Sequence, residues 1–345
     1  MTTTFTPYLP PWYLRNGIIH TVAATYWYGK RWEIWKNQVS WVQSYPSLPW
    51  QEKVFLGAED VPLWGKWVCP PDACGTIILN YGITGDAEQA WYAHLTAYKA
   101  YAQGWAVLLY DWRGHGKTGE LSPVPPSDGW REGADQVLLA QQLVALGCPP
   151  NVVLIGFSLG GQLALWGLKE GYNSPDIKGA ATLCPNLESN RTLDYLLSYP
   201  FGRLVERSLT KQLIAGARRQ AHCFPDAVTE ETVDRINSIR SFDRAIVIDY
   251  YGFSSVSDYY YQTGGLYLLD QLTLPYLVVY AADDPLFDPS LVPDLKARID
   301  SNPKGDLLLS DRGGHVAHIG KKSQAEDQFW GINRLLDFAN QLIIN

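Results

Sequence analysis

The sequence predicts an α/β fold in which helices cover both faces of a mainly parallel sheet. Two observations carry this prediction. Short apolar runs alternate with amphipathic stretches of helical spacing along the 345 residues, as in strand–helix–strand units with right-handed crossovers. One apolar run, Val152 to Ile155, leads directly into Gly156-Phe157-Ser158-Leu159-Gly160. A serine is therefore expected at the corner between a buried strand and a helix.

The elements can be assigned in chain order. The apolar runs predict strands at 52–57 and 63–68, which would start the sheet antiparallel, and then at 76–80, 106–110, 152–155 and 177–183. Helical spacing predicts helices at 88–103 and 128–146, followed by Gly104 and Gly147 respectively. The alternation of strands and helices stops after residue 185. It resumes with strands at 275–280 and 306–309, and a closing helix is expected at about 324–343.

This pattern predicts three parts. Residues 1–50, rich in Pro and Trp, form an N-terminal wrapping extension; residues 51–185 and 266–345 form the α/β core; residues 186–265 form a mostly helical cap. Long connections of this kind are commonly lids or binding elements. The clearest helix in the cap is predicted at 229–240, with two glutamates in its first turn. An apolar cluster is expected to roof the serine: Leu193, Tyr195, Leu196, Leu197, Tyr199 and Phe201.

Composition excludes several classes of function. The net charge is −7, the sequence pI is about 5.4, and basic residues form no long run, so nucleic acid is not an expected partner. The five cysteines show no C-x-x-C and no zinc spacing; Cys69 and Cys74 are close enough in sequence to pair, but two free thiols are expected. With no transmembrane segment or apolar leader in the sequence, we expect a cytoplasmic protein. The aromatic N-terminus leaves peripheral membrane contact open, and the oligomeric state is not predicted.

The serine corner has the features of a nucleophile elbow. Such a turn strains the central residue, so the positions two before and two after it must be small, as Gly156 and Gly160 are. The turn would expose the Ser158 hydroxyl and aim the Leu159 amide at a developing oxyanion. A second amide is expected from Ile83, in the glycine-punctuated loop after strand 76–80. Ser254 also follows an apolar run, but Val256 two residues later is too large for an elbow.

A serine of this kind needs a histidine and an acid, in the chain order Ser, Asp, His. Asp284 lies just after strand 275–280 and before a proline, and it is the favoured acid; Asp283 and Asp288 are alternatives. Four of the six histidines precede the acid, which leaves His315 and His318. The preceding Gly313-Gly314 favours His315, because the glycines let the backbone bend the imidazole over the sheet edge.

At these residues the sequence resembles the YheT-like family of α/β-hydrolases, relatives of the vertebrate abhydrolase-domain esterases and of yeast medium-chain ester enzymes. The resemblance runs nearly end to end. It includes PWYLRNG at 11–17 with Thr21, GFSLGG at 156–161, SFD at 241–243 with YGF at 251–253 and DYY at 258–260, AADDP at 281–285, and GGHV at 313–316. The chain departs from the family at Tyr81, where a histidine is usual, and at His20, where a glutamine is usual. The loop at 113–117 is closer to the monoglyceride-lipase form.

The resemblance implies an α/β-hydrolase fold and a serine esterase or lipase-type enzyme. The expected reaction is hydrolysis of small to medium-chain acyl or lipid-like esters by Ser158, His315 and Asp284, with the amides of Ile83 and Leu159 as oxyanion donors. It needs no cofactor and no metal. Acyl transfer to an alcohol through the same acyl-enzyme is the alternative, and a non-catalytic scaffold is a further one.

Overall fold

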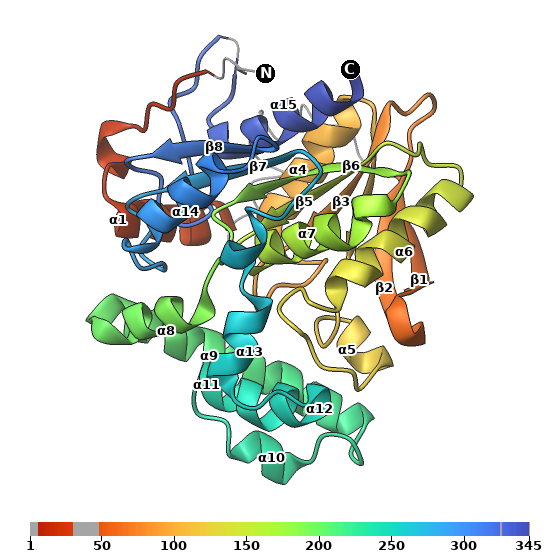
Figure 1. Ribbon diagram of the computed structural model, residues 1–345, viewed down its shortest axis with the longest axis vertical. Helices are drawn as coiled ribbons and strands as arrows, with labels where there is room; N and C mark the ends of the chain where they lie inside the picture. Colours follow the sequence, from red (N-terminus) through yellow and green to blue (C-terminus); the bar gives the residue numbers. More distant parts are fainter. Residues whose placement is uncertain (1–5, 30–47, 325, 345) are drawn as a thin grey trace.

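The computed structural model describes residues 6–29, 48–324 and 326–344. Within these residues an eight-stranded sheet runs through the centre of the molecule in the order β1-β2-β4-β3-β5-β6-β7-β8 (Figure 1). The pairs β1–β2 and β2–β4 are antiparallel, and all pairs from β4 to β8 are parallel. The strands are β1 (Gln51–Leu56), β2 (Pro62–Val68), β3 (Gly75–Asn80), β4 (Trp105–Tyr110), β5 (Val152–Phe157), β6 (Ile177–Leu183), β7 (Tyr276–Ala281) and β8 (Gly305–Ser310). The predicted α/β fold class is confirmed.

Helices cover both faces of this sheet. On one face α6 (Glu132–Ala145) packs beside α7 (Leu159–Glu170), and on the other α4 (Trp91–Ala102) lies beside α15 (Trp330–Ile344) (Figure 1). The amide of Gln136 joins the first pair by donating to the Leu163 carbonyl at 2.7 Å. Shorter elements near the core are α5 (Thr118–Leu121), α14 (Leu291–Asp300), and the 3₁₀ turns η3 (Ala58–Asp60), η4 (Gly171–Asn173) and η6 (Gly265–Leu268).

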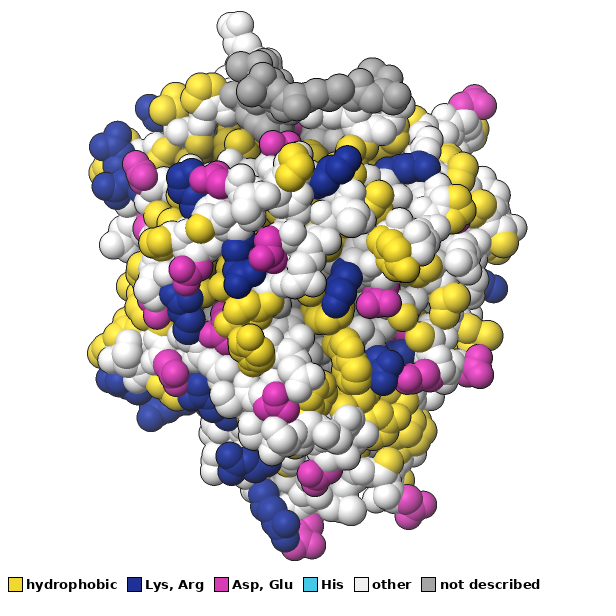
Figure 2. Space-filling model, viewed as in Figure 1, with side chains coloured by type: hydrophobic (Ala, Val, Ile, Leu, Met, Phe, Trp, Pro, Cys, Tyr) yellow, Lys and Arg dark blue, Asp and Glu magenta, His cyan; other side chains and the backbone are white. Residues whose placement is uncertain are grey.

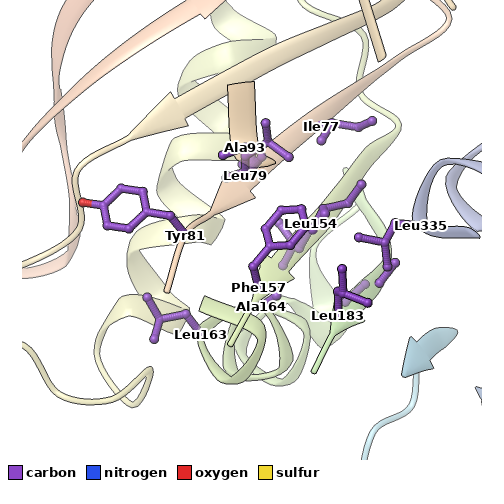
Figure 3. Packing of buried hydrophobic residues seen from close by; sticks show 14 of the residues in the cluster. Ile77, Leu79, Tyr81, Ala93, Leu154, Phe157, Leu163, Ala164, Leu183 and Leu335 are labelled. Atoms are coloured by element: carbon purple, nitrogen blue, oxygen red, sulfur yellow. The ribbon is translucent and has the colours of Figure 1, made fainter. Parts of the chain in front are cut away.

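The core lies between the central strands and these helices. All six residues of β5 are buried, which explains why this strand reads as an uninterrupted apolar run rather than an alternating one. Figure 3 shows Leu154 and Phe157 of this strand among side chains of β3, β6, α4, α7 and α15. The strand that leads to Ser158 is therefore fixed by packing on both faces.

A helical insertion lies between β6 and β7 and projects from the carboxyl ends of the strands (Figure 1). It has its own apolar core. Its helices are α8 (Ser189–Ser198), α9 (Pro200–Cys223), α10 (Glu230–Asp234), α11 (Ile239–Phe242), the π-helical turn η5 (Asp243–Ile248), α12 (Asp249–Tyr251) and α13 (Val256–Thr263). We call this group of helices the cap.

Several predicted helix boundaries are wrong. The helix expected at 229–240 is two short helices, because the Ser238 side chain caps a new one by accepting from the Ser241 amide. The long helix α9 was not predicted. The helix expected from 128 begins only at Glu132, since Asp128 and Gly129 have φ of 51° and 105°. Helices α4 and α15 likewise start three and six residues late, at Trp91 and Trp330.

The N-terminal residues that the structure describes lie against the β7–β8 side of the sheet (Figure 1). They form η1 (Trp12–Leu14), α1 (Gly17–Val22) and η2 (Ala23–Gly29). The remainder of the expected extension, at 1–5 and 30–47, falls outside the described residues.

The molecular surface agrees with the charge pattern of the sequence. Figure 2 shows acidic and basic side chains interspersed over one face rather than gathered by sign. All five cysteines are free. Across residues 6–29, 48–324 and 326–344, no helix combines the length and apolarity that crossing a bilayer requires.

Candidate active site

Ser158 occupies a strained turn between β5 and α7. Its backbone has φ 54° and ψ −125°, values that a non-glycine residue adopts only when the surrounding structure enforces them. Gly156 and Gly160 permit the turn: a Cβ on Gly156 would lie 2.1 Å from the Gly160 carbonyl oxygen, and one on Gly160 would lie 2.2 Å from the Asn80 carbonyl oxygen. The glycine spacing thus reflects backbone contact that no larger residue would allow.

The structure brings Ser158, His315 and Asp284 into one hydrogen-bonded chain. His315 Nε2 lies 2.9 Å from Ser158 Oγ, and His315 Nδ1 lies 2.8 Å from Asp284 Oδ2. The acid is buried, and its other oxygen accepts from the Leu286 amide at 2.8 Å. Phe287 packs edge-on against the imidazole at 4.9 Å between ring centroids. A carboxylate on Nδ1 keeps Nε2 free to accept a proton from the serine.

The alternative acids make other contacts. Asp283 Oδ1 accepts from the Gly314 amide at 3.0 Å, so this residue braces the loop that carries His315. Asp288 accepts from the Ser290 amide at 2.8 Å, as a turn-capping residue does.

The alternative base and nucleophile also lie apart from this chain. His318 is buried beside Ser310, with Nε2 at 3.1 Å from the hydroxyl, and burial lowers its pKa to about 3. Ser254 is exposed and donates to Asp258 at 2.8 Å. The apolar run before Ser254 is helical, in η5, and not a strand.

Two backbone amides are available beside Ser158. Leu159 is the first residue of α7, where an amide has no partner within the helix. Ile83 follows Gly82, whose own amide donates to the Tyr92 hydroxyl at 3.0 Å. Among the described residues neither the Ile83 nor the Leu159 amide donates a hydrogen bond. Both are therefore free to bind an oxyanion.

The N-terminal helix α1 holds the loop that carries His315, a function that the sequence analysis did not predict. The Thr21 hydroxyl accepts from the His315 amide at 2.8 Å and donates to the Gly17 carbonyl at 2.8 Å. His20 Nε2 accepts from the Ile319 amide at 3.0 Å, and burial lowers the pKa of His20 to about 4. The two residues are neighbours in the family-like N-terminal motif, which was the available signal.

Tyr81, the other departure from the family pattern, makes its side-chain hydrogen bond outside the chain of Ser158, His315 and Asp284. Its hydroxyl donates to Asp111 Oδ1 at 2.8 Å, and Asp111 also accepts from the amides of Ala87 and Lys117. Burial raises the pKa of Asp111 to about 6. Tyr81 thus orders the loops that follow β3 and β4.

Two pockets meet at Ser158. The first lies between core and cap, encloses about 700 Å³ including open solvent at its mouth, and is largely apolar, with Leu193, Leu209 and Phe242 among its lining residues. The second is lined by aromatic and aliphatic side chains, including Trp91 and Val316, and by His315. His315 does not line the first pocket.

The expected apolar roof is correct only in part. Leu193 and Leu196 line the first pocket, but Leu197 is exposed, and Tyr199 donates instead to the Pro285 carbonyl. The rest of the roof comes from helices that were not assigned to it: Leu209 and Leu213 of α9, and Ile239 and Phe242 of α11.

The described residues offer one group of metal-ligand type. Ligand atoms of Cys184, Asp284 and His315 lie within 4.8 Å of one another. Burial raises the pKa of the Cys184 thiol well above its usual range, so the thiol stays protonated. Asp284 and His315 are hydrogen-bonded to each other. This donor set does not fit a metal centre.

Comparison with known proteins decides the family. Residues 75–322 match the sequence profile of the alpha/beta hydrolase fold. The chain belongs to the α/β-hydrolase fold family. It is 37% identical to "Putative esterase slr0264" of Synechocystis sp., over 97% of this chain and 94% of that protein. It is 27% identical to "Putative esterase YheT" of Escherichia coli, over 76% and 75%. The resemblance to the YheT-like family is thereby confirmed.

More distant relatives agree. The chain is 25% identical to "Phospholipase ABHD3" of Mus musculus, over 71% of this chain and 58% of that one. Among solved structures, the Pyrococcus furiosus esterase PF2001 matches with a TM-score of 0.57 and 18% identity, covering 86% of this chain and 92% of that one. At that identity the likeness shows the fold.

Proposed function

We propose that this α/β-hydrolase cleaves carboxylic esters with Ser158 as nucleophile, His315 as base and Asp284 as the acid that orients it. The observation that carries the proposal is the unbroken chain from Ser158 Oγ through His315 to Asp284, with contacts of 2.9 and 2.8 Å. The esterase and phospholipase names of the relatives support ester bonds as the substrate class.

The reaction follows from these contacts. Ser158 Oγ attacks the ester carbonyl as its proton passes to His315 Nε2, and Asp284 stabilises the imidazolium that forms. The carbonyl oxygen gains charge and accepts hydrogen bonds from the amides of Ile83 and Leu159. His315 then protonates the leaving alkoxide, which departs and leaves an acyl-enzyme. Water, deprotonated by His315, attacks the acyl-enzyme, and His315 returns the proton to Ser158 Oγ as the acid is released.

The position of His315 supports an assignment of the two pockets. The leaving alcohol must take its proton from His315 Nε2, so the alcohol part belongs in the second pocket, which His315 lines. We call this pocket the alcohol arm. The acyl chain then occupies the first pocket, under the cap, which we call the acyl arm. Its leucine-rich lining favours small to medium-chain acyl groups.

Acyl transfer to an alcohol is the second candidate, and the alcohol arm favours it. Trp91, Leu209 and Val316 give this arm an apolar wall that could hold an alcohol beside His315 in place of water. Analysis of products formed with and without added alcohol separates the two reactions.

The test of the proposal is Ser158→Ala. This change should leave the protein folded and abolish both p-nitrophenyl ester cleavage and fluorophosphonate labelling, with an activity loss on the order of 10⁴-fold or more. Ser254→Ala is the matched control and should be labelled like the wild type. Labelling that persists in Ser158→Ala would show that another residue is the nucleophile.

A further inference from the structure

The acyl arm is not apolar throughout. Two carboxyl groups line it, one from each side: Asp128 from the loop before α6, and Asp243 from the first turn of η5 in the cap. Asp243 accepts a hydrogen bond from the Tyr260 hydroxyl. Among the described residues neither carboxyl forms an ion pair, and the Gln162 side chain donates to the backbone oxygen of Asp128 rather than to its carboxyl. The two acids therefore face the cavity without a counter-ion.

Two further groups lining this arm lack partners. Trp112 Nε1 and His115 Nε2 are buried, and neither has a hydrogen-bond partner among the described residues. The two rings stack with centroids 3.4 Å apart. His115 Nδ1 lies 3.1 Å from the Arg113 carbonyl, which can only accept, so Nδ1 carries the hydrogen and Nε2 is an acceptor. An unpaired donor and an unpaired acceptor thus lie side by side.

Three other polar residues that line the acyl arm already have hydrogen-bond partners. Asn186 donates to Ser189 at 2.8 Å and accepts from the Thr192 hydroxyl at 3.1 Å, so these three residues satisfy one another. A plain hydrocarbon chain that filled the arm would expel water from the carboxyl groups of Asp128 and Asp243 and offer them no hydrogen bond in return. Such an arrangement discriminates against substrates that lack a matching polar group.

The protonation states indicate a neutral ligand group. Burial, together with the neighbouring Asp243, raises the pKa of Asp128 well above its usual range, and burial raises the pKa of Asp243 to about 7. Burial lowers the pKa of His115 to about 4, so its ring is uncharged. Near neutral pH Asp128 and His115 are thus uncharged and Asp243 is close to its titration midpoint, so the wall offers both donors and acceptors and carries at most one charge. A hydroxyl both donates and accepts, whereas an ammonium would require ionised carboxylates.

We propose that the acyl arm binds an acyl chain that carries a hydroxyl group, with Asp128 and Asp243 as specificity-determining residues. This inference rests on the proposed ester hydrolysis and names its substrate class as hydroxyacyl esters. The hydroxyl would donate to one of the acceptors in the wall and accept from one of the donors.

The experiment compares esters that share one leaving group. At pH 7, kcat/KM is measured for p-nitrophenyl octanoate, for its 3-, 6- and 8-hydroxy derivatives, and for the 8-amino derivative. At least one hydroxy ester should exceed octanoate by about tenfold or more. The 8-amino ester should gain nothing. Each comparison is a ratio within one protein, so it does not depend on how stable a variant is.

Variants separate hydrogen bonding from charge. Asp128→Leu and Asp243→Leu should remove the preference for the hydroxyl, whereas Asp128→Asn and Asp243→Asn, which still donate and accept, should keep most of it. Asp249→Asn, at an exposed site in α12, is the control. The inference is overturned if the wild type prefers octanoate to every hydroxy ester, if the amino ester is preferred, or if the leucine variants retain the preference. Hydrolysis of octanoate without any preference would refute this inference alone, whereas absence of all Ser158-dependent hydrolysis would refute the proposed function.

Discussion

Replacing Thr21 with valine tests whether the N-terminal helix positions His315, the proposed base. Valine keeps the shape of threonine but removes the hydroxyl that accepts from the His315 amide and donates to the Gly17 carbonyl, each at 2.8 Å. The His315 amide then loses its acceptor beside a buried side chain, which costs about 1–3 kcal/mol in the native arrangement of the loop. The loop can avoid that cost by shifting, and His315 would shift with it.

A small displacement of His315 should reduce kcat far more than it changes KM. The ring must reach both Ser158 and Asp284, at 2.9 and 2.8 Å, and a misplacement of about 1 Å can lower the rate about 10²-fold. We therefore expect kcat for p-nitrophenyl butyrate to fall about 10- to 100-fold in Thr21→Val, with KM within about twofold.

Two further variants make the result decisive. Thr21→Ser retains the hydroxyl and should recover most of kcat. Thr76→Val removes a buried hydroxyl that donates to the Pro149 carbonyl at 2.8 Å, near the amino end of β3 and far from Ser158. It should cost a similar amount of unfolding free energy and leave kcat unchanged. Full kcat in Thr21→Val, or an equal loss in Thr76→Val, would refute the positioning role.

Two other outcomes follow from burial. Across p-nitrophenyl esters from acetyl to dodecanoyl, kcat/KM should rise about fourfold per methylene, from about 0.8 kcal/mol each, until the acyl arm is full; a flat or falling profile would contradict the assignment of that arm. Burial lowers the pKa of His94 to about 4, so the unfolded chain binds the proton first, and the stability that neutral His94 provides above pH 6.5 is lost toward pH 4. The free energy of unfolding in urea should therefore fall by about 1.4 kcal/mol more in the wild type than in His94→Gln when the pH is lowered from 8 to 5.5. An equal fall in both proteins would show that His94 does not titrate this way.

The parts of the site that the sequence predicted are those with local geometric requirements. Ser158 stands out because the turn around it excludes side chains at Gly156 and Gly160, and that exclusion leaves a spacing in the sequence. Asp284 and His315 follow from their order after Ser158 and from the strands before them. The sheet was predictable for a related reason, since strands buried on both faces, such as β5, are apolar at every position.

The parts that were missed depend on contacts between distant residues. Thr21 and His315 are 294 positions apart, and no local pattern indicates that a threonine hydroxyl will accept from a histidine amide. Helix α9 has a narrow buried stripe, with Leu213 and Ala217 among many exposed polar residues, so its period is weak in the sequence. The interruption between α10 and α11 depends on Ser238 acting as an N-cap. It could not be predicted because serine also occurs within helices.

The dependence of His315 on α1 has an energetic consequence. Helix α1 runs directly into η2, and together they form a helical stretch too short to be stable in isolation, so it keeps its form only while it is docked on α4 and on the loop that carries His315. The side-chain hydrogen bonds between α1 and this loop are those of Thr21 and His20, whereas β5 is buried on both faces of an eight-stranded sheet. Regions held by few buried contacts open at a lower free energy than the core does. The hydrogen-bonded chain through His315 can therefore be broken by loss of this docking while the sheet and the turn at Ser158 remain intact. For that reason kcat, rather than the free energy of unfolding, is the quantity most sensitive to Thr21.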